Sequence, residues 1–188
     1  MIDFNNDIDK CLEVLHRGGV ILYPTDTIWG IGCDATNEEA VARVYKIKKR
    51  PDTRALIVLV ADERELLKYV AHPDPTVFDY IENADRPTTV IFDGAIGLAD
   101  NLVASDGSIG IRICKEDFCR HLIKRFRKPI VSTSANISGE TSPANFGEVT
   151  NEIKEKADYV VQYRQDERSA CEPSSIIKFK NGQIEKLR

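Results

Sequence analysis

Apolar residues in this chain occur in short runs separated by amphipathic segments. A-L-I-V-L-V at residues 55–60 and V-I-L-Y at residues 20–23 are each long enough for a buried strand. A membrane-spanning helix needs about 20 consecutive apolar residues, and no run approaches that length. The chain has 188 residues, of which 42% are hydrophobic and 30% are charged, so we expect a soluble α/β protein with a substantial core.

Periodicity and turn residues divide the chain into alternating helices and strands. Helices are predicted at residues 5–17, 37–48, 62–70, 75–82, 116–127 and 146–156. Strands are predicted at residues 20–23, 55–60, 88–92, 109–114, 129–133, 159–163, 174–180 and 183–187, with a loop at 24–32. Because the alternation is irregular and the chain closes with a hairpin, we expect a twisted mixed sheet with helices packed on it. No repeat or linker interrupts the pattern, which predicts one domain over residues 1–188.

Composition narrows the classes of function. The five cysteines form no C-x-x-C pair and the three histidines lie at no ligand spacing, which disfavours a zinc site and a disulfide framework. We therefore expect buried, reduced cysteines. The first ten residues are polar and acidic and lack the features of a signal peptide, so a cytoplasmic location is expected.

Polar side chains gather where predicted strands end, which is where open α/β sheets bind ligands. The first motif, P-T-D-T-I-W-G-I-G at residues 24–32, is either a loop that holds a small polar ligand or a capped turn. The second motif is K-K-R-P at residues 48–51. In an extended segment Lys48 and Arg50 point the same way, and together they suit phosphate oxygens. A basic end of a helix that neutralises the helix dipole is the alternative.

Three further motifs follow or open predicted strands. S-I-G-I-R at residues 108–112 places Arg112 inside an apolar strand, where it needs either a ligand carboxylate or a structural ion pair. Residues 132–143 carry S-T-S-A-N-I-S-G and S-P, whose hydroxyl and amide groups can bind phosphate or ribose. P-S-S at residues 173–175 opens a strand. The usual P-loop and dinucleotide-binding motifs do not occur in the chain.

The order and spacing of these motifs resemble those of the YrdC-like family of L-threonylcarbamoyladenylate synthases. The motifs that carry the resemblance are P-T-D-T-I-W-G-I-G, K-K-R-P, G-I-R, S-T-S-A-N-I-S-G, S-P and S-S-I-I. The resemblance covers nearly the whole chain. It implies a YrdC/RibB-like α/β fold, in which a twisted mixed sheet with flanking helices forms a concave, positively charged cavity. Two departures from the family pattern are Trp29, where tyrosine is usual, and R-P-T-T at residues 86–89, which replaces a longer W-P-G-P-L-T.

The resemblance also implies roles for individual residues. Lys48 and Arg50 correspond to the K-x-R pair of the family and would be the catalytic residues that neutralise charge on the phosphates. The implied ATP-binding residues are Lys48, Arg50, Ser108, Ser134, Asn136, Ser142 and Arg188, the implied threonine-binding residues are Thr25, Arg112, Ser132 and Ser174, and no metal ligand is implied.

The implied reaction converts ATP, bicarbonate and L-threonine to threonylcarbamoyl-AMP and pyrophosphate, the first step of N6-threonylcarbamoyladenosine (t6A) formation in tRNA. ATP would be a substrate that carries Mg²⁺, and tRNA threonylcarbamoyl-transfer proteins would take the product. Two alternatives remain open. One is a double-stranded RNA-binding module, which the basic clusters at residues 46–54 and 115–128 favour and the net charge of −4 disfavours. The other is a catalytically silent relative that only binds a nucleotide.

Overall fold

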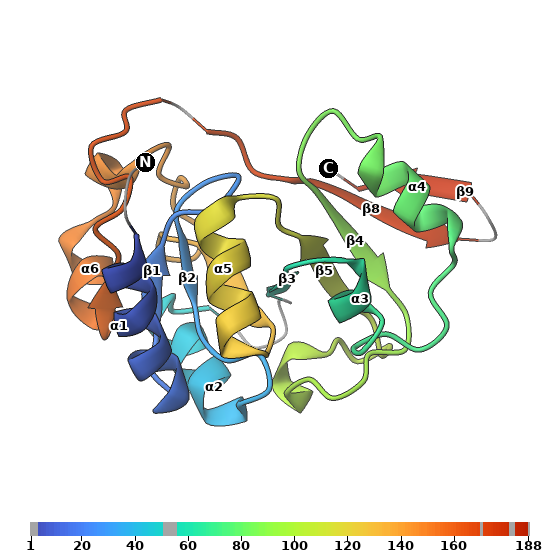
Figure 1. Cartoon of the computed structure of the whole chain (residues 1–188), viewed down its shortest axis with the longest axis horizontal. Helices are drawn as coiled ribbons and strands as arrows, with labels where there is room; N and C mark the ends of the chain where they lie inside the picture. Colours follow the sequence, from blue (N-terminus) through green and yellow to red (C-terminus); the bar gives the residue numbers. More distant parts are fainter. Residues whose placement is uncertain (1–3, 51–55, 170, 181–182, 188) are drawn as a thin grey trace.

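One nine-stranded sheet runs through the described part of the molecule (Figure 1). In spatial order its strands are β7 (Tyr159–Val160), β1 (Ile21–Tyr23), β2 (Gly30–Gly32), β6 (Ile130–Ser134), β3 (Ile57–Val60), β5 (Ile109–Ile113), β4 (Thr88–Phe92), β8 (Ser175–Lys180) and β9 (Gln183–Lys186). The pairs β1/β7, β3/β5 and β4/β8 are parallel, and the other neighbouring pairs are antiparallel. The prediction of a mixed, twisted sheet is therefore confirmed.

The structure is a computed structural model, and it describes residues 4–50, 56–169, 171–180 and 183–187. Helix α1 (Asn5–His16) precedes the first strand. The helices between later strands are α2 (Glu38–Ile47), α3 (Glu63–Leu66), α4 (Thr76–Glu82), α5 (Asp117–Phe126) and α6 (Asn151–Lys156), with 3₁₀ turns at Asp100–Leu102 and Phe146–Glu148. In Figure 1, α1 and α5 lie side by side in front of the sheet, and α2 lies below them. None of the helices among these residues is long and apolar enough to cross a membrane.

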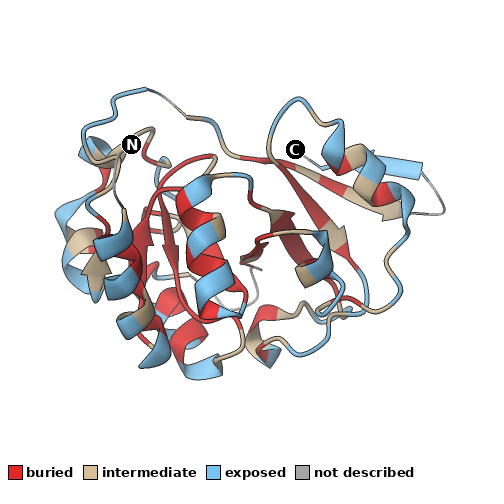
Figure 2. Cartoon of the chain, viewed as in Figure 1, coloured by how far each residue is buried: buried red, intermediate tan, exposed pale blue. Residues whose placement is uncertain are grey.

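Helix α5 shows how the sequence pattern produces this packing. The Glu116 side chain accepts a hydrogen bond from the backbone N–H of Cys119 and caps the first turn. Phe118, Leu122 and Ile123 are buried on one side of the helix. Figure 2 shows the resulting division of α5 into a buried side and an exposed side.

Four predicted elements differ from the structure. The helix predicted over residues 146–156 divides into a 3₁₀ turn and α6, because Val149 and Thr150 are extended. The predicted helix at residues 62–70 ends at Leu66, and the predicted strand at 159–163 ends at Val160. The predicted loop at residues 24–32 ends in strand β2. A three-residue strand with glycine at both ends offers no alternation of side chains by which to recognise it.

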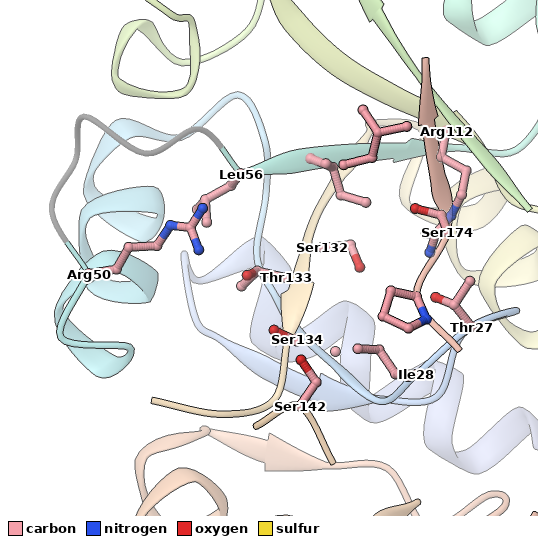
Figure 3. Close-up of a pocket in the computed structure, with 14 residues that line it drawn as sticks. Thr27, Ile28, Arg50, Leu56, Arg112, Ser132, Thr133, Ser134, Ser142 and Ser174 are labelled. Carbon is pink, nitrogen blue, oxygen red and sulfur yellow. The ribbon is translucent and has the colours of Figure 1, made fainter. Parts of the chain in front are cut away.

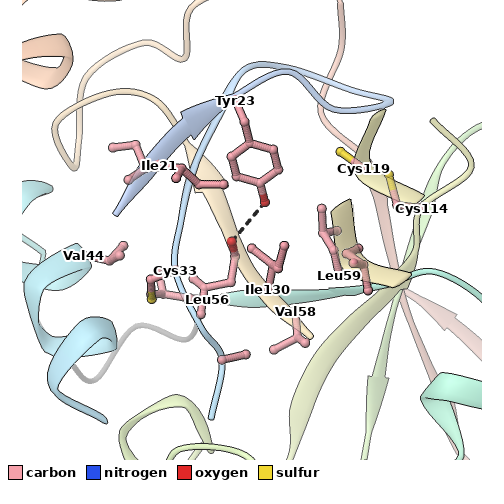
Figure 4. Packing of buried hydrophobic residues seen from close by; sticks show 14 of the residues in the cluster. Ile21, Tyr23, Cys33, Val44, Leu56, Val58, Leu59, Cys114, Cys119 and Ile130 are labelled. Atoms are coloured by element: carbon pink, nitrogen blue, oxygen red, sulfur yellow. Dashed lines mark hydrogen bonds between the residues drawn. The ribbon is translucent and has the colours of Figure 1, made fainter. Parts of the chain in front are cut away.

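The first glycine-rich motif is explained by how closely β2 approaches β6. A Cβ atom on Gly32 would collide with the carbonyl oxygen of Val131. On the other side of β2, the hydroxyl of Tyr23 donates a hydrogen bond to the same carbonyl oxygen at 3.0 Å, as Figure 4 shows. The close approach of these strands brings Ser134 of β6 opposite Gly30, the first residue of β2 after the P-T-D-T segment.

The cysteines lie mainly in the core. Cys11, Cys33, Cys114 and Cys119 are buried, as predicted, whereas Cys171 is only partly buried, and all five are free thiols. Burial raises the pKa of the Cys119 thiol well above its ordinary value. We therefore expect it to remain protonated and unreactive.

Candidate functional site

A cavity of about 190 Å³, partly open to solvent, lies where the polar motifs meet (Figure 3). Figure 3 shows Arg50 and Arg112 at opposite ends of the cavity, with the residues of β6 between them. None of the described lining residues is acidic, so the cavity suits an anionic ligand. The lining residues are Thr27, Ile28, Gly30, Arg50, Leu56, Ile57, Arg112, Ser132, Thr133, Ser134, Ser142, Pro173, Ser174 and Ile176.

Arg112 reaches the cavity from the middle of β5. Its side chain is 2% exposed, and its Nη2 lies 3.1 Å from Oδ1 of Asp26. Neighbouring side chains of a strand point to opposite faces, so Ile111 packs into the core while Arg112 faces the cavity. The sequence left open whether Arg112 binds a ligand or forms a structural ion pair. In this structure both are possible, because the same side chain contacts Asp26 and lines the cavity.

The P-T-D-T loop between β1 and β2 presents Thr27 rather than Thr25 to the cavity. Thr25 is buried, and its hydroxyl donates to the carbonyl oxygen of Ile28 at 2.9 Å and accepts from the backbone N–H of Thr27 at 3.0 Å. The Thr25 hydroxyl therefore stabilises the turn from within. Among the described lining residues it is Thr27 that supplies a hydroxyl from this loop.

The K-K-R segment ends α2 in a tight turn, so it is not the extended segment predicted from the sequence. The N–H of Lys49 donates to the carbonyl oxygen of Lys46, and the N–H of Arg50 donates to that of Tyr45. Lys49 is left-handed, with φ of 49°. This pattern is a Schellman motif, which needs a left-handed residue after the last helical turn. The interpretation that Lys48 and Arg50 converge by strand alternation is wrong, although Lys49 does point away from the cavity and pairs with Glu152.

Lys48 lies behind the cavity wall. Its side chain is 1% exposed, and its ammonium donates to the carbonyl oxygens of Ser134 and Asn136, the second at 2.7 Å. Burial, together with the positive charge of Arg50, lowers the pKa of Lys48 to about 8. Lys48 is not among the lining residues, so it acts on the cavity through the turn that carries Ser134.

In the serine-rich segment that begins in β6, some side chains line the cavity and others hold the turn in shape. Ser132, Ser134 and Ser142 line the cavity. Asn136 is buried, and its amide donates to the carbonyl oxygens of Ile137 at 3.1 Å and Glu140 at 2.8 Å. Asn136 therefore closes the turn, and Ser134 and Ser142 present its hydroxyls to the cavity.

The remaining predicted site residues lie in different places. Ser174 lines the cavity, and its hydroxyl lies 2.8 Å from that of Thr89 on β4. Ser108 is buried just before β5 and is not among the described lining residues; its backbone N–H donates to Oδ1 of Asp106 at 3.0 Å. Arg188 lies outside the residues that the structure describes.

Comparison with known proteins identifies the family. The family model Sua5/YciO/YrdC, described as "Telomere recombination", matches residues 13–188. The chain belongs to this family. A curated relative in Methanocaldococcus jannaschii, named a putative threonylcarbamoyl-AMP synthase, is 37% identical over 95% of this chain and 85% of its own length. A relative in Pseudoalteromonas translucida, named threonylcarbamoyl-AMP synthase, is 31% identical over 94% of this chain and 95% of its own.

Solved members of the Sua5/YciO/YrdC family share the fold. P. abyssi Sua5 in complex with L-threonine superposes with a TM-score of 0.87 at 22% identity, and E. coli YciO with a TM-score of 0.83 at 22%. This chain is covered completely by the Sua5 chain and to 97% by YciO. It spans 55% of that Sua5 chain and 88% of YciO. At these identities the likeness establishes the YrdC-like fold that the resemblance implied.

Sequence reasoning missed residues that act across long chain separations. Arg164 lies in no motif, yet its Nη1 donates to the carbonyl oxygen of Thr25 at 3.0 Å and lies 3.8 Å from Glu116. Arg164 therefore supports the P-T-D-T loop from the segment that leads toward β8. The sequence does offer Thr27 as a candidate for lining the cavity, because the first motif contains two hydroxyl residues. Nothing in the sequence points to Arg164, which lies 139 residues from its partner.

Proposed function

We propose that this protein is an L-threonylcarbamoyl-AMP synthase that uses ATP, bicarbonate and L-threonine. The observation that carries the proposal is the cavity, which has an arginine at each end, hydroxyl groups between them and no acidic side chain among its described lining residues. A nucleotide presents anionic phosphates and an amino acid presents an anionic carboxylate, so such a cavity can hold the two side by side. The curated names of the relatives support the same activity.

The proposed chemistry depends on charge rather than on a general base. The amino group of threonine and bicarbonate give a carbamate with loss of water, and a carbamate oxygen attacks the α-phosphorus of ATP and displaces pyrophosphate. The carbamate is already anionic, so the protein has to align it with the phosphate and neutralise charge on the leaving group. Arg50 is proposed to bind the phosphates. Lys48 holds the Ser134 turn in place and adds a positive charge behind it.

The other lining residues have proposed roles on either side of the reacting atoms. Arg112 binds the carboxylate of threonine, with the hydroxyls of Thr27, Ser132 and Ser174 near it. Ser134 and Ser142 hydrogen-bond the nucleotide. Mg²⁺ is proposed to enter with ATP on its phosphate oxygens, next to hydroxyl rather than carboxylate groups of the protein, and would add to the neutralisation of charge.

We expect pyrophosphate release from ATP to require threonine and bicarbonate together, because the attacking carbamate forms only from both. The measurement is pyrophosphate release with each substrate omitted in turn, combined with detection of the adenylate by mass spectrometry. Equal release without threonine would contradict the synthase and indicate a simple ATP hydrolase.

The product is proposed to pass, in the cytoplasm, to tRNA threonylcarbamoyl-transfer proteins for t6A formation. Direct RNA binding is less well supported by the structure. In the basic stretch at residues 115–128, Lys124, Arg125 and Lys128 pair with Asp62, Asp9 and Asp34 respectively. These pairs neutralise much of the charge that an RNA backbone would need.

A further inference from the structure

The ion pair between Asp26 and Arg112 is incompletely satisfied. Among the residues that the structure describes, three buried side-chain atoms lack a hydrogen-bond partner, and two of them are Oδ1 of Asp26 and Nε of Arg112. These two charged groups are in ionic contact at 3.1 Å, yet no N–H of the guanidinium is directed at Oδ1 in a hydrogen bond. Buried polar groups are normally paired, so this exception calls for an explanation.

The two residues face different spaces. Arg112 lines the main cavity, whereas Asp26 lines a smaller neighbouring hollow together with Asp85 and Lys115. Oδ2 of Asp26 accepts a long hydrogen bond of 3.4 Å from the backbone N–H of Lys115, just beyond β5. Asp26 therefore contacts both the side chain of Arg112 and the end of the strand that carries it, without lining the cavity itself.

We propose that Asp26 is a positioning residue, which holds the Arg112 guanidinium at its end of the cavity and thereby sets the affinity and selectivity for a substrate carboxylate. The inference rests on the proposed function, in which that carboxylate belongs to L-threonine. Asp26 neutralises the buried charge of Arg112 when the cavity is empty. Because Arg112 lines the cavity while it contacts Asp26, its planar fork can still donate hydrogen bonds to a ligand carboxylate.

This arrangement predicts a selectivity that a purely structural ion pair would not give. A carboxylate offers two oxygens and a negative charge to the fork, whereas the amide of threonine offers one acceptor and no charge. The preference for threonine over threonine amide therefore measures how well Arg112 is oriented. Loss of Asp26 should reduce that preference and weaken threonine binding, and should leave ATP binding unchanged.

The test compares Asp26→Asn with wild type and with Asp85→Asn, a matched control. Asp85 lines the same hollow and is exposed, and no ion pair joins it to Arg112 among the described contacts. For Asp26→Asn we expect the KM for threonine to rise roughly tenfold, equivalent to about 1.4 kcal/mol of binding, with kcat changed less than about threefold. The Kd for ATP, measured by calorimetry, should stay within about twofold. Asp26→Glu, which keeps the charge, should restore most of the preference for threonine over its amide.

The outcomes separate this inference from the proposed function. If wild type shows no threonine-dependent turnover, the proposed function is wrong. If wild type is active and Asp26→Asn keeps both its threonine KM and its selectivity against the amide, Asp26 does not position Arg112. Should Asp26→Asn fail to fold, Arg112→Lys tests the same point, because lysine keeps the charge but lacks the fork. Undiminished selectivity in Arg112→Lys would also overturn the inference.

Discussion

Replacing Arg50 with lysine should lower the rate of threonylcarbamoyl-AMP formation about a hundredfold. Lysine keeps the charge but loses the planar fork that binds two phosphate oxygens together. Loss of one such contact to the transition state typically costs roughly 3 kcal/mol. Arg50 lies after the last turn of α2, is only partly buried and stands at one end of the cavity, so we expect the melting temperature to change by less than about 2 °C. The measurement is kcat at saturating substrates together with a thermal melt.

Lys49→Ala is the matched control for this change. Lys49 points away from the cavity, and its 2.9 Å ion pair with Glu152 lies at the surface, where such pairs contribute little to stability. We expect its activity to remain within about twofold of wild type. If Lys49→Ala loses as much activity as Arg50→Lys, the segment acts as a general basic patch and the specific role of Arg50 is refuted.

Lys48→Met should abolish a dependence of stability on pH that wild type shows between about pH 8 and pH 10.5. Folding lowers the pKa of Lys48 from 10.5 to about 8, chiefly through burial. Below pH 8 the ammonium is charged in both states, and its burial lowers the free energy of unfolding. As the pH rises from 8 to 10.5, the folded protein loses the proton while the unfolded chain keeps it. The free energy of unfolding therefore rises with pH in this window, by about 3 kcal/mol in total from this residue.

The measurement is urea unfolding of both proteins at several pH values in that range. Other side chains of the unfolded chain exchange protons in this range as well, so the informative quantity is the difference between wild type and Lys48→Met at each pH. A difference that does not change with pH would contradict the buried, charged state assigned to Lys48. Lys49→Met, which alters an exposed ammonium, should follow the wild-type curve.

The mixed sheet could be predicted from sequence because it depends on local patterns. Apolar runs such as residues 55–60 and the amphipathic pattern of α5 each carry their own evidence. The helix and strand boundaries that were predicted wrongly are those that depend on tertiary contacts. Strand β2 exists because glycines permit a close approach to β6, and the break before α6 follows from two extended residues that no local pattern marks.

The motifs of the candidate site could be predicted from the sequence, but the separate role of each residue within a motif could not. Neighbouring hydroxyls in P-T-D-T are chemically alike, and only the turn geometry shows that Thr25 stabilises the loop while Thr27 faces the cavity. The same holds for Lys48 and Arg50, which the Schellman turn separates onto the back and the front of one wall. Such assignments depend on backbone dihedral angles, which the spacing of residues in a motif does not specify.

The pairing of β8 with β4 also determines when the cavity can form during folding. Ser174 completes one wall, and its contact with Thr89 joins residues 85 positions apart in a parallel pair of strands. Parallel pairing over such a separation requires closure of a large loop, which is slow compared with the formation of α1 or α5. A nascent chain that has not yet extended through β8 can contain most of its helices and still lack a complete cavity. During refolding, helical circular dichroism should therefore recover before ligand binding does.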